Sequence, residues 1–326
     1  MNTVNFEKMI SIDNLLLAWK EFTRGKRNKK DVQEFQLHLM DNILFLHQEL
    51  KDKTYIHGKY YAFNISDPKP RNIHKATVRD RLLHHAIYRV LYSYFDKKFI
   101  CNSYSCRINK GTHKAMNRFR EYARKVSKNN TKTCFVLKCD IKKFFANIDH
   151  KILKKILEKH IKDKNIMWLF SQVIDSFNSI YAIADICMGL PLGNLTSQLL
   201  VNIYMNEFDQ FMKRKLKVEY YIRYADDFVI LSDDKNYLEE LLLKISDFLN
   251  KELKLQLHPD KVFIKTVASG LDFLGWVHFL EHQVLRTSTK RRMLKRLKEN
   301  PKEESRRSYL GMLKHGNTYK ITCLLN

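Results

Sequence analysis

The sequence predicts an α+β fold built on an antiparallel sheet with helices on one face. Three apolar segments have the length and composition of strands, residues 134–141, 219–232 and 256–267. The middle segment reads as two strands that pivot about residues 225–227, and stretches with helical periodicity separate the three segments. The resulting order of strand, helix, strand pair, helix and strand is typical of a split βαβ unit.

The chain before this unit is predicted to be mainly helical. Residues 8–50 carry apolar positions at helical spacing, broken by the basic segment RGKRNKK, which predicts two helices joined by a charged loop. Residues 55–76 alternate in polarity and then meet Pro68 and Pro70. This pattern predicts a strand or hairpin running into a basic turn.

Helical periodicity recurs through the rest of the chain. It predicts helices near residues 79–96, 146–161, 195–217 and 235–254. Residues 271–280 read as further strand, and the remainder is basic and mostly helical.

The charge balance indicates a polyanionic partner. The 326 residues include 59 Lys plus Arg against 35 Asp plus Glu, a formal net charge of +24. A basic membrane-surface protein would have the same sign of charge, but no apolar run approaches the roughly 18 to 20 residues of a membrane span, and no amino-terminal signal pattern is present. We therefore expect a cytoplasmic protein.

The cysteines and paired histidines favour structural roles. None of the six cysteines forms a CxxC pair, which predicts reduced thiols. His84 and His85 lie within the apolar stretch VRDRLLHHAIYRVL, which favours helix packing over metal binding.

Carboxylates occur inside the predicted strands. Asp140 lies near the end of the first strand, and Asp226 and Asp227 lie in the middle of the strand pair. Burying such groups costs several kcal/mol unless a cation or hydrogen bonds compensate. Two Mg²⁺ ions about 3.5 to 4 Å apart would do so and would support in-line phosphoryl transfer. The alternative is an ordinary hairpin turn, in which Asp is common.

Phe144 and Phe145 follow Asp140 by four and five residues. A bulky ring at this point would fill the space of a ribose 2′-hydroxyl and so select deoxynucleotides. Core packing is the alternative explanation.

Cationic residues flank the predicted site in the sequence. Arg71, Lys75, Arg79 and Arg81 follow the proline turn and would reach a triphosphate, or else form a solvated basic face. Lys261, in LHPDKVFI, falls where a strand begins and would stabilise or protonate a leaving pyrophosphate.

Taken in this order, four motifs resemble those of reverse transcriptases. CDIKKFF at 139–145 looks like the first metal-binding motif and YADD at 224–227 like the second. LHPDK at 257–261 is similar to the lysine motif, and FLGW at 273–276 to the primer-grip hairpin. The resemblance covers roughly residues 55–320.

The resemblance implies a right-hand polymerase fold with three domains. Residues 1–130 would form N-terminal helices and fingers, and residues 131–285 a palm that includes finger–palm helices at 150–217. Residues 286–326 would form a short helical thumb. No maturase, endonuclease or protease domain is expected.

The resemblance also implies an RNA-directed DNA polymerase and roles for individual residues. Catalysis would use Asp140, Asp226, Asp227 and Lys261, and two Mg²⁺ would be bound by Asp140, Ile141, Asp226 and Asp227. The implied dNTP-binding residues are Arg71, Lys75, Arg79, Phe145, Leu192, Gly193 and Gln198. The implied primer grip is Phe273, Leu274, Gly275 and Trp276. The thumb residues expected to contact nucleic-acid phosphates are Lys290, Arg291, Arg292, Lys295, Arg296 and Lys314.

One motif points to a subfamily. GLPLGNLTSQ at 189–198 is similar to the signature of reverse transcriptases from diversity-generating retroelements. Most other bacterial reverse transcriptases carry PQG followed by Ser-Pro at this place. That resemblance implies mutagenic retrohoming: a template-repeat RNA is copied into cDNA with errors at adenines, and the cDNA replaces a variable repeat in a target gene. Leu192 would stand in place of the glutamine that restrains the incoming nucleotide, which predicts low fidelity.

The implied partners are template RNA, a primer or cDNA strand, dNTPs and an oligomer of a small basic accessory protein, with no membrane. Within the enzyme class, the alternatives are a retron, group II intron or antiphage reverse transcriptase. Outside it, the alternative is a non-catalytic RNA-binding scaffold, which would have no need to bury three carboxylates together.

Overall fold

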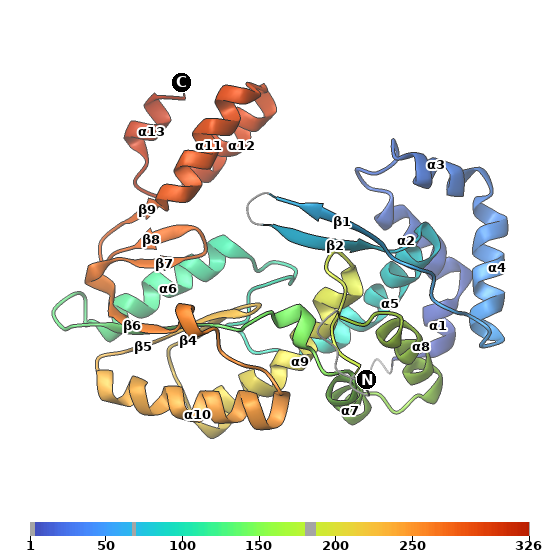
Figure 1. Cartoon of the computed structure of the whole chain (residues 1–326), viewed down its shortest axis with the longest axis horizontal. Coiled ribbons are helices and arrows are strands. Elements are labelled where there is room, and N and C mark those ends of the chain that lie inside the picture. Colours follow the sequence, from blue (N-terminus) through green and yellow to red (C-terminus); the bar gives the residue numbers. More distant parts are fainter. Residues whose placement is uncertain (1–3, 67–69, 180–186, 326) are drawn as a thin grey trace. The chain divides into compact units, whose positions relative to one another are not determined.

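Two compact units make up the chain. The computed structural model describes residues 4–66, 70–179 and 187–325. Unit 1 consists of Met1–Ile100, Lys142–Phe211 and Phe248–Gln256. Unit 2 consists of Cys101–Ile141, Met212–Asp247 and Leu257–Asn326. The elements of both units are labelled in Figure 1. The three-domain division at residues 130 and 285 stays a prediction.

Unit 1 begins with four helices where the sequence pattern predicted two. These are α1 (Phe6–Ile10), α2 (Ile12–Phe22), α3 (Lys30–Leu37) and α4 (Leu39–Lys51). Two local features divide the expected helices. The hydroxyl of Ser11 caps α2 by accepting a hydrogen bond from the amide of Asn14, and His38 leaves helical geometry at φ −119°. The basic loop lies between α2 and α3, as predicted.

A hairpin and a long helix follow in unit 1. Strands β1 (Tyr61–Ile65) and β2 (Arg71–Lys75) pair antiparallel, which confirms the predicted hairpin. Figure 1 shows the hairpin extending away from the helices of the unit. Pro68 lies outside the described residues. Helix α5 (Val78–Asp96) begins at Thr77, whose hydroxyl accepts from the amide of Asp80.

The remainder of unit 1 is helical. A 3₁₀ turn (Phe144–Asn147) precedes α7 (His150–His160) and α8 (Lys164–Asp175). Helix α9 (Leu195–Gln210) is buried on most of its circumference and continues into a π-helical turn, Phe211–Lys215. The predicted helix at 195–217 is thus confirmed, although its last turn is not α-helical.

The central sheet of unit 2 has the predicted topology. Its strands are β3 (Phe135–Asp140), β4 (Tyr221–Tyr224), β5 (Asp227–Ser232) and β6 (Phe263–Thr266). Their order is β4-β5-β3-β6, and each neighbouring pair is antiparallel. This is the arrangement of a split βαβ unit.

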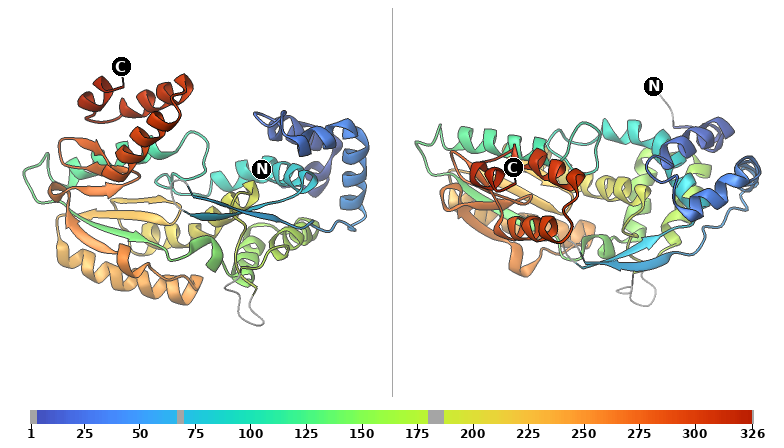
Figure 2. Two further views of the ribbon diagram at one scale, coloured as in Figure 1. Left: turned by 45° about the horizontal axis from the view of Figure 1, so that its top comes forward. Right: turned by 90° about the horizontal axis from the view of Figure 1, so that it is seen from above.

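Helices cover both faces of this sheet, which corrects the expectation of one covered face. Helix α6 (Thr112–Val126) lies on one side and α10 (Lys235–Leu253) on the other (Figures 1 and 2). Successive residues of β3 point to opposite faces, yet Val136 and Leu137 are both fully buried. The strands therefore read as continuous apolar runs because neither face meets solvent.

A second small sheet and three helices complete unit 2. The sheet contains β7 (Leu271–Phe273), β8 (Trp276–His278) and β9 (Gln283–Leu285) in that order, all antiparallel. The helices are α11 (Thr287–Glu299), α12 (Glu303–Leu313) and α13 (Tyr319–Cys323). Met116, Trp276, Leu285, Met293 and Leu313 form one buried cluster that joins α6, this sheet, α11 and α12.

All six cysteines are free thiols, and Cys134 and Cys139 are buried. None of the helices in the described residues combines the length and apolar character needed to span a bilayer.

Candidate active site

The predicted carboxylates meet at one edge of the central sheet. Asp140 is the last residue of β3, and Asp227, the first residue of β5, lies directly opposite it in the antiparallel register. Asp226 occupies the turn between β4 and β5, and its carbonyl oxygen accepts a hydrogen bond of 3.2 Å from the amide of Ile141. Strand pairing therefore gathers these residues in unit 2, as the sequence order implied.

Lys261 reaches the same edge from a 3₁₀ turn. The turn, Pro259–Lys261, precedes β6, so Lys261 does not begin a strand as predicted. The amide of His258 donates to the carbonyl oxygen of Asp140 at 2.7 Å and anchors the turn. The Lys261 ammonium lies 2.7 Å from Asp140 Oδ1. A side chain 121 positions away in sequence thus balances the Asp140 charge.

Asp227 lies in a buried and negatively charged setting at this edge. Burial raises the pKa of Asp227 to about 7, and repulsion from Asp226 and Asp140 adds to the rise, whereas Lys138 opposes it. Lys138 Nζ lies 3.5 Å from Asp227 Oδ2. The other oxygen, Oδ1, is buried without a hydrogen-bond partner in the described part of the chain. This edge therefore favours a cation that would stabilise the ionised form.

Lys138 also connects the carboxylate edge to the second sheet. Its ammonium donates to the carbonyl oxygen of Asp272 at 2.6 Å, next to Phe273 of β7. The Asp272 carboxylate is in turn bound by Arg286. Sequence reasoning missed Lys138, although a lysine inside the apolar run CFVLKCDI was a usable signal.

A second missed residue supports the turn that carries Asp226. Arg223 in β4 is fully buried. Its guanidinium donates to the carbonyl oxygen of Ala225 at 3.0 Å and to the hydroxyl of Ser103 at 3.1 Å. Ala225 has a left-handed φ of 57°, a conformation that is unusual for a residue with a Cβ. The signal was an arginine within the apolar stretch YYIRYADD.

The hairpin expected to grip a primer is present in unit 2. Phe273 ends β7 and Trp276 begins β8, and both side chains are buried. Leu274 and Gly275 form the connecting turn with φ values of 52° and 87°. Positive φ at both central residues matches the right-handed twist of a tight hairpin.

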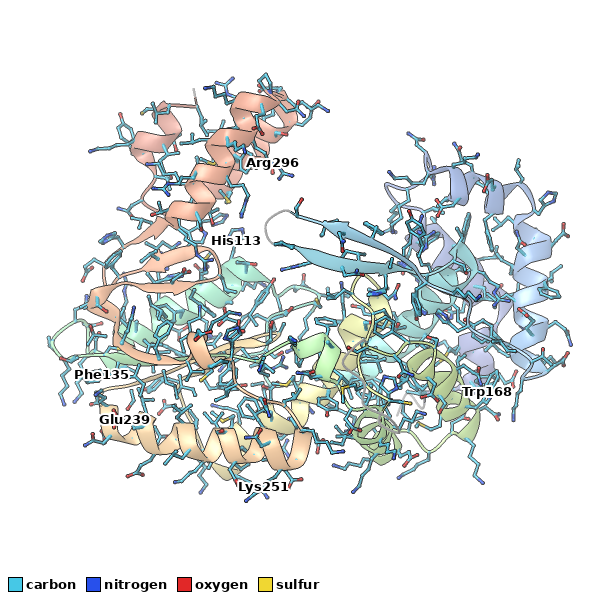
Figure 3. The ribbon with its side chains drawn as sticks, viewed as in Figure 1. His113, Phe135, Trp168, Glu239, Lys251 and Arg296 are labelled. Carbon is cyan, nitrogen blue, oxygen red and sulfur yellow. The ribbon has the colours of Figure 1, made fainter. Side chains whose placement is uncertain are left out.

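The cationic residues expected to contact nucleic acid lie on and after α11. Lys290, Arg291, Lys295 and Arg296 are exposed on α11, and Arg292 is half-buried. Figure 3 shows Arg296 on this helix. Lys314 is exposed just after α12. These side chains are therefore available to a polyanion.

The cations predicted to reach a triphosphate belong to unit 1, and three of the four, Lys75, Arg79 and Arg81, already have acidic partners. Lys75 Nζ lies 2.6 Å from Asp31, which also binds Arg81. The Arg79 guanidinium lies 2.9 Å from Glu49 and donates to the carbonyl oxygen of Ile56. Arg71 is exposed at the start of β2. The fold thus uses Lys75 and Arg79 in ion pairs that the sequence did not reveal.

The remaining predicted dNTP-binding residues also lie in unit 1, where the turn at 188–194 meets β2. The amide of His74 donates to the carbonyl oxygen of Leu192 at 3.0 Å. Gly193 has a φ of 108°, and a Cβ there would lie 3.0 Å from Ile73. The amide of Leu190 donates to the carbonyl oxygen of Phe145 at 2.8 Å, which ties the 3₁₀ turn to the same region.

Gln198 lies in the first turn of α9, four residues after Asn194 at the N-cap position, and its side chain is half-buried. Phe144 is buried and packs edge-on against Phe145 at 5.6 Å between ring centroids. The roles assigned to the unit 1 residues stay predictions.

A family comparison decides what kind of domain this is. The model of the family described as reverse transcriptase (RNA-dependent DNA polymerase) matches residues 65–278, which run from the last residue of β1 through the carboxylate edge to the end of β8. The chain belongs to the reverse transcriptase family. It carries the RNA-directed DNA polymerase domain of that family.

Curated relatives of this reverse transcriptase include a bacterial protein and a group II intron-encoded protein. Protein YkfC of Escherichia coli (strain K12) is 24% identical over 274 residues, covering 74% of this chain and 70% of YkfC. The group II intron-encoded protein LtrA of Lactococcus lactis subsp. cremoris is 23% identical over 295 residues, covering 70% of this chain and 48% of LtrA. The chain therefore spans less than half the length of LtrA.

Solved telomerase structures share the fold of this reverse transcriptase. Telomerase from Candida albicans, solved with a fragment of telomeric RNA, superimposes with a TM-score of 0.51 at 14% identity, covering 71% of this chain and 45% of that chain. A truncated apo telomerase from Candida tropicalis gives a TM-score of 0.52 at 12% identity, covering 76% and 60%. At these identities the similarity concerns the fold alone.

Reverse transcriptases as a family use divalent metals, and the donor atoms of the carboxylate edge suit such ions. Carboxylate oxygens are the ligands that Mg²⁺ prefers, and Asp227 Oδ1 is a buried acceptor without a hydrogen-bond partner among the described residues. Within the described residues, however, no three acidic, histidine or cysteine side chains are already gathered as a metal cluster. Nucleotide phosphates and water would complete the coordination, as is usual for Mg²⁺.

Proposed function

We propose that this reverse transcriptase extends a primer by Mg²⁺-dependent nucleotidyl transfer at the edge where Asp140 faces Asp227. The observation that carries the proposal is the direct register of these two carboxylates, with Asp226 in the adjoining turn. A buried acceptor oxygen on Asp227 and its raised pKa favour the arrival of cations. When bound, two Mg²⁺ would activate the primer 3′-hydroxyl and hold the triphosphate.

Each residue of the edge has a task in this proposal. Asp140, Asp226 and Asp227 supply the carboxylate oxygens for the ions, and the backbone of Ile141 supports the turn through its bond to Asp226. Lys261 releases Asp140 when the ions arrive and donates a proton to the leaving pyrophosphate.

Nucleotide binding falls to the predicted residues of unit 1. Arg71 is the exposed cation of β2, whereas Lys75 and Arg79 would have to exchange Asp31 and Glu49 for phosphate oxygens. The Phe145 ring would exclude a ribose 2′-hydroxyl. Leu192, Gly193 and Gln198 would line the position of the incoming base and sugar.

Template and primer would be held by unit 2. The exposed cations of α11 and Lys314 would bind phosphates without reading sequence. The Phe273–Trp276 turn would support the primer end. Lys138 joins this turn to Asp227 through the carbonyl oxygen of Asp272, so the primer and the carboxylate would be positioned together.

For the biological role, we propose diversification of a target gene through error-prone copying of adenines in a template-repeat RNA. Leu192 and the Ser197-Gln198 pair support this subtype. A small basic accessory protein and a cytoplasmic location belong to the same proposal. A group II intron-type enzyme is the second candidate, and the similarity to LtrA favours it.

Primer extension on a defined RNA template with Mg²⁺ and the four dNTPs tests the mechanism. Wild type and Asp226→Ala are compared, and the products are sequenced. We expect cDNA from the wild type, none from Asp226→Ala, and equal RNA binding by both. Errors concentrated at template adenines would support diversification, and accurate cDNA would favour the intron-type enzyme. No synthesis by the wild type, even with an accessory protein, would favour a binding scaffold.

A further inference from the structure

The surface of α6 that faces away from the sheet holds a concentration of positive charge that the proposed polymerase mechanism does not use. A groove of about 540 Å³ opens there, and we call it the α6 groove. It is lined by Asn117, Arg120, Glu121, Arg124, Lys125, Lys128 and Asn129. The chain passes from this end of α6 to Phe135 at the start of β3, whereas Asp140 ends that strand. The groove is thus near the end of β3 that is remote from the carboxylate edge.

Helical periodicity builds the groove. Asn117, Arg120 and Arg124 follow one another at intervals of three or four residues, so they share one face of α6, and Lys128 lies just beyond the end of the helix. The opposite face is buried in the core through residues such as Phe119. At the end of the groove, residues 128–130 all have left-handed φ values, 48°, 57° and 69°, and the amide of residue 129 donates to the carbonyl oxygen of residue 124 at 2.8 Å. This hydrogen bond fixes the backbone at the end of α6, where the groove ends.

The charges of the groove are not balanced within the protein. Four cationic side chains face a single carboxylate, Glu121. Lys125 and Arg118 already bind that carboxylate at 2.9 and 2.7 Å and hold its pKa below the usual value. In the described ranges, no carboxylate lies within ion-pair distance of Arg124 or Lys128, and Arg120 only donates to Asn117 Oδ1 at 2.7 Å. Like charges at helical spacing repel each other, so an anionic ligand would stabilise this face.

The lining identifies the class of ligand. Among the residues that the structure describes, no aromatic or aliphatic side chain lines the groove, so it lacks the apolar anchors typical of a protein interface or of membrane insertion. Guanidinium groups bind phosphate oxygens in a two-point geometry, and the amides of Asn117 and Asn129 suit ribose hydroxyls as well as phosphates. We propose that the α6 groove binds the sugar–phosphate backbone of duplex RNA, at a site additional to the polymerase site. The proposal does not rest on the polymerase mechanism, because its test is binding.

The experiment measures how salt weakens the binding of a blunt RNA hairpin with a stem of about 16 base pairs. The test variant is Arg120→Gln/Arg124→Gln/Lys128→Gln. The matched control removes the same charge from exposed lysines of α7 and α8, in Lys151→Gln/Lys155→Gln/Lys164→Gln. Kd is measured between about 50 and 200 mM salt, and thermal melting checks that each variant folds.

We expect the slope of log affinity against log salt to become shallower by about 2 to 3 in the test variant, since about one unit is lost for each phosphate contact removed. The control variant should keep the wild-type slope. Arg120→Lys/Arg124→Lys should also keep the slope but bind more weakly, because lysine loses the two-point geometry.

An unchanged slope in the test variant would overturn the proposal. A DNA hairpin of the same sequence separates the two sources of phosphodiester backbone, and an effect on DNA without one on RNA would also overturn it. Primer extension on a short template should remain at the wild-type rate in the test variant. A wild type that binds RNA through the groove but makes no cDNA would count only against the polymerase mechanism.

Discussion

The guanidinium group of Arg223 donates a hydrogen bond of 3.0 Å to the carbonyl oxygen of Ala225, from a fully buried position behind the turn that carries Asp226. Its second terminal nitrogen donates to the hydroxyl of Ser103, whose segment also forms a parallel bridge with Arg223. Ala225 has a left-handed φ, so the turn needs external support. Arg223 supplies that support and thereby positions the Asp226 carboxylate.

Arg223→Met should therefore impair both folding and catalysis. The substitution keeps bulk but removes the donors to Ala225 and Ser103, and each buried acceptor left unsatisfied costs about 1–3 kcal/mol. Urea denaturation measures the loss of stability, and primer extension by the folded fraction measures the loss of rate. Arg24→Met, at an exposed arginine, is the control. Full activity in a folded Arg223→Met protein would show that the turn holds its shape unaided.

Lys261→Met should slow nucleotide addition without weakening nucleotide binding. If Lys261 protonates the leaving group, kcat should fall by about 10²- to 10⁴-fold, while KM for dNTP changes little. Single-turnover extension at saturating dNTP measures the rate. The exposed Lys265, in β6, provides the control as Lys265→Met. Equal rates for the two variants would leave Lys261 with only its ion pair to Asp140.

Leu192→Gln should reduce misincorporation opposite template adenines. A glutamine amide would add hydrogen bonds that restrain the incoming nucleotide, whereas leucine offers only apolar contact. Sequencing of cDNA made on a defined RNA template gives the error spectrum. Leu37→Gln, at a leucine that is 79% exposed on α3, controls for the change in polarity. An unchanged error spectrum would count against the proposed role of Leu192.

Two glycines near the carboxyl end should respond in opposite ways to the same substitution. A Cβ at Gly316 would overlap the Trp276 ring and lie 2.9 Å from the carbonyl oxygen of Gln283, so Gly316→Ala should destabilise unit 2 by about 1–3 kcal/mol. Gly311, within α12, has open space around it, and Gly311→Ala should stabilise the helix by about 0.5–1 kcal/mol. Thermal melting of the two variants compares them. A stable Gly316→Ala protein would mean that the Trp276 ring can move aside.

Buried histidines should make the protein less stable in mild acid. Burial lowers the pKa of His84 to about 3 and that of His278 to about 4, well below the value of about 6.5 for an unfolded chain. Both imidazoles are thus neutral when folded, and below about pH 6.5 only the unfolded state takes up their protons. The contribution of the two neutral histidines to the free energy of unfolding is fully present above that pH. It is lost as the pH falls toward 4, by up to about 1.4 kcal/mol per pH unit for each histidine.

Urea denaturation between about pH 8 and pH 5 gives the free energy of unfolding on both sides of the pKa of an unfolded histidine. His84→Gln should flatten the profile, because the substituted side chain does not titrate. His282→Gln, at an exposed position, should leave the slope unchanged. Identical profiles for wild type and His84→Gln would contradict the assignment.

The sequence by itself determined the elements of the site that depend on local pattern. Asp140, Asp226 and Asp227 were recognisable as candidate site residues because they lie in apolar runs of strand length, where a buried carboxylate requires compensation. The order of these runs and of the helical segments was enough to predict the split βαβ sheet. Residues 271–280 were likewise recognisable as strand from their apolar pattern, whereas the hairpin at Phe273–Trp276 was implied by the resemblance of FLGW to a primer grip.

Only the tertiary structure decided which charged groups meet. Asp31 and Glu49 bind Lys75 and Arg79 from helices far away in the chain, and Lys138 reaches both Asp227 and the carbonyl oxygen of Asp272. Helix α6 covers the second face of the sheet. An amphipathic pattern alone shows that one face of a helix is buried but does not identify the element against which it packs. Periodicity reports that a face is buried, whereas the group that it meets depends on chain segments brought together by folding.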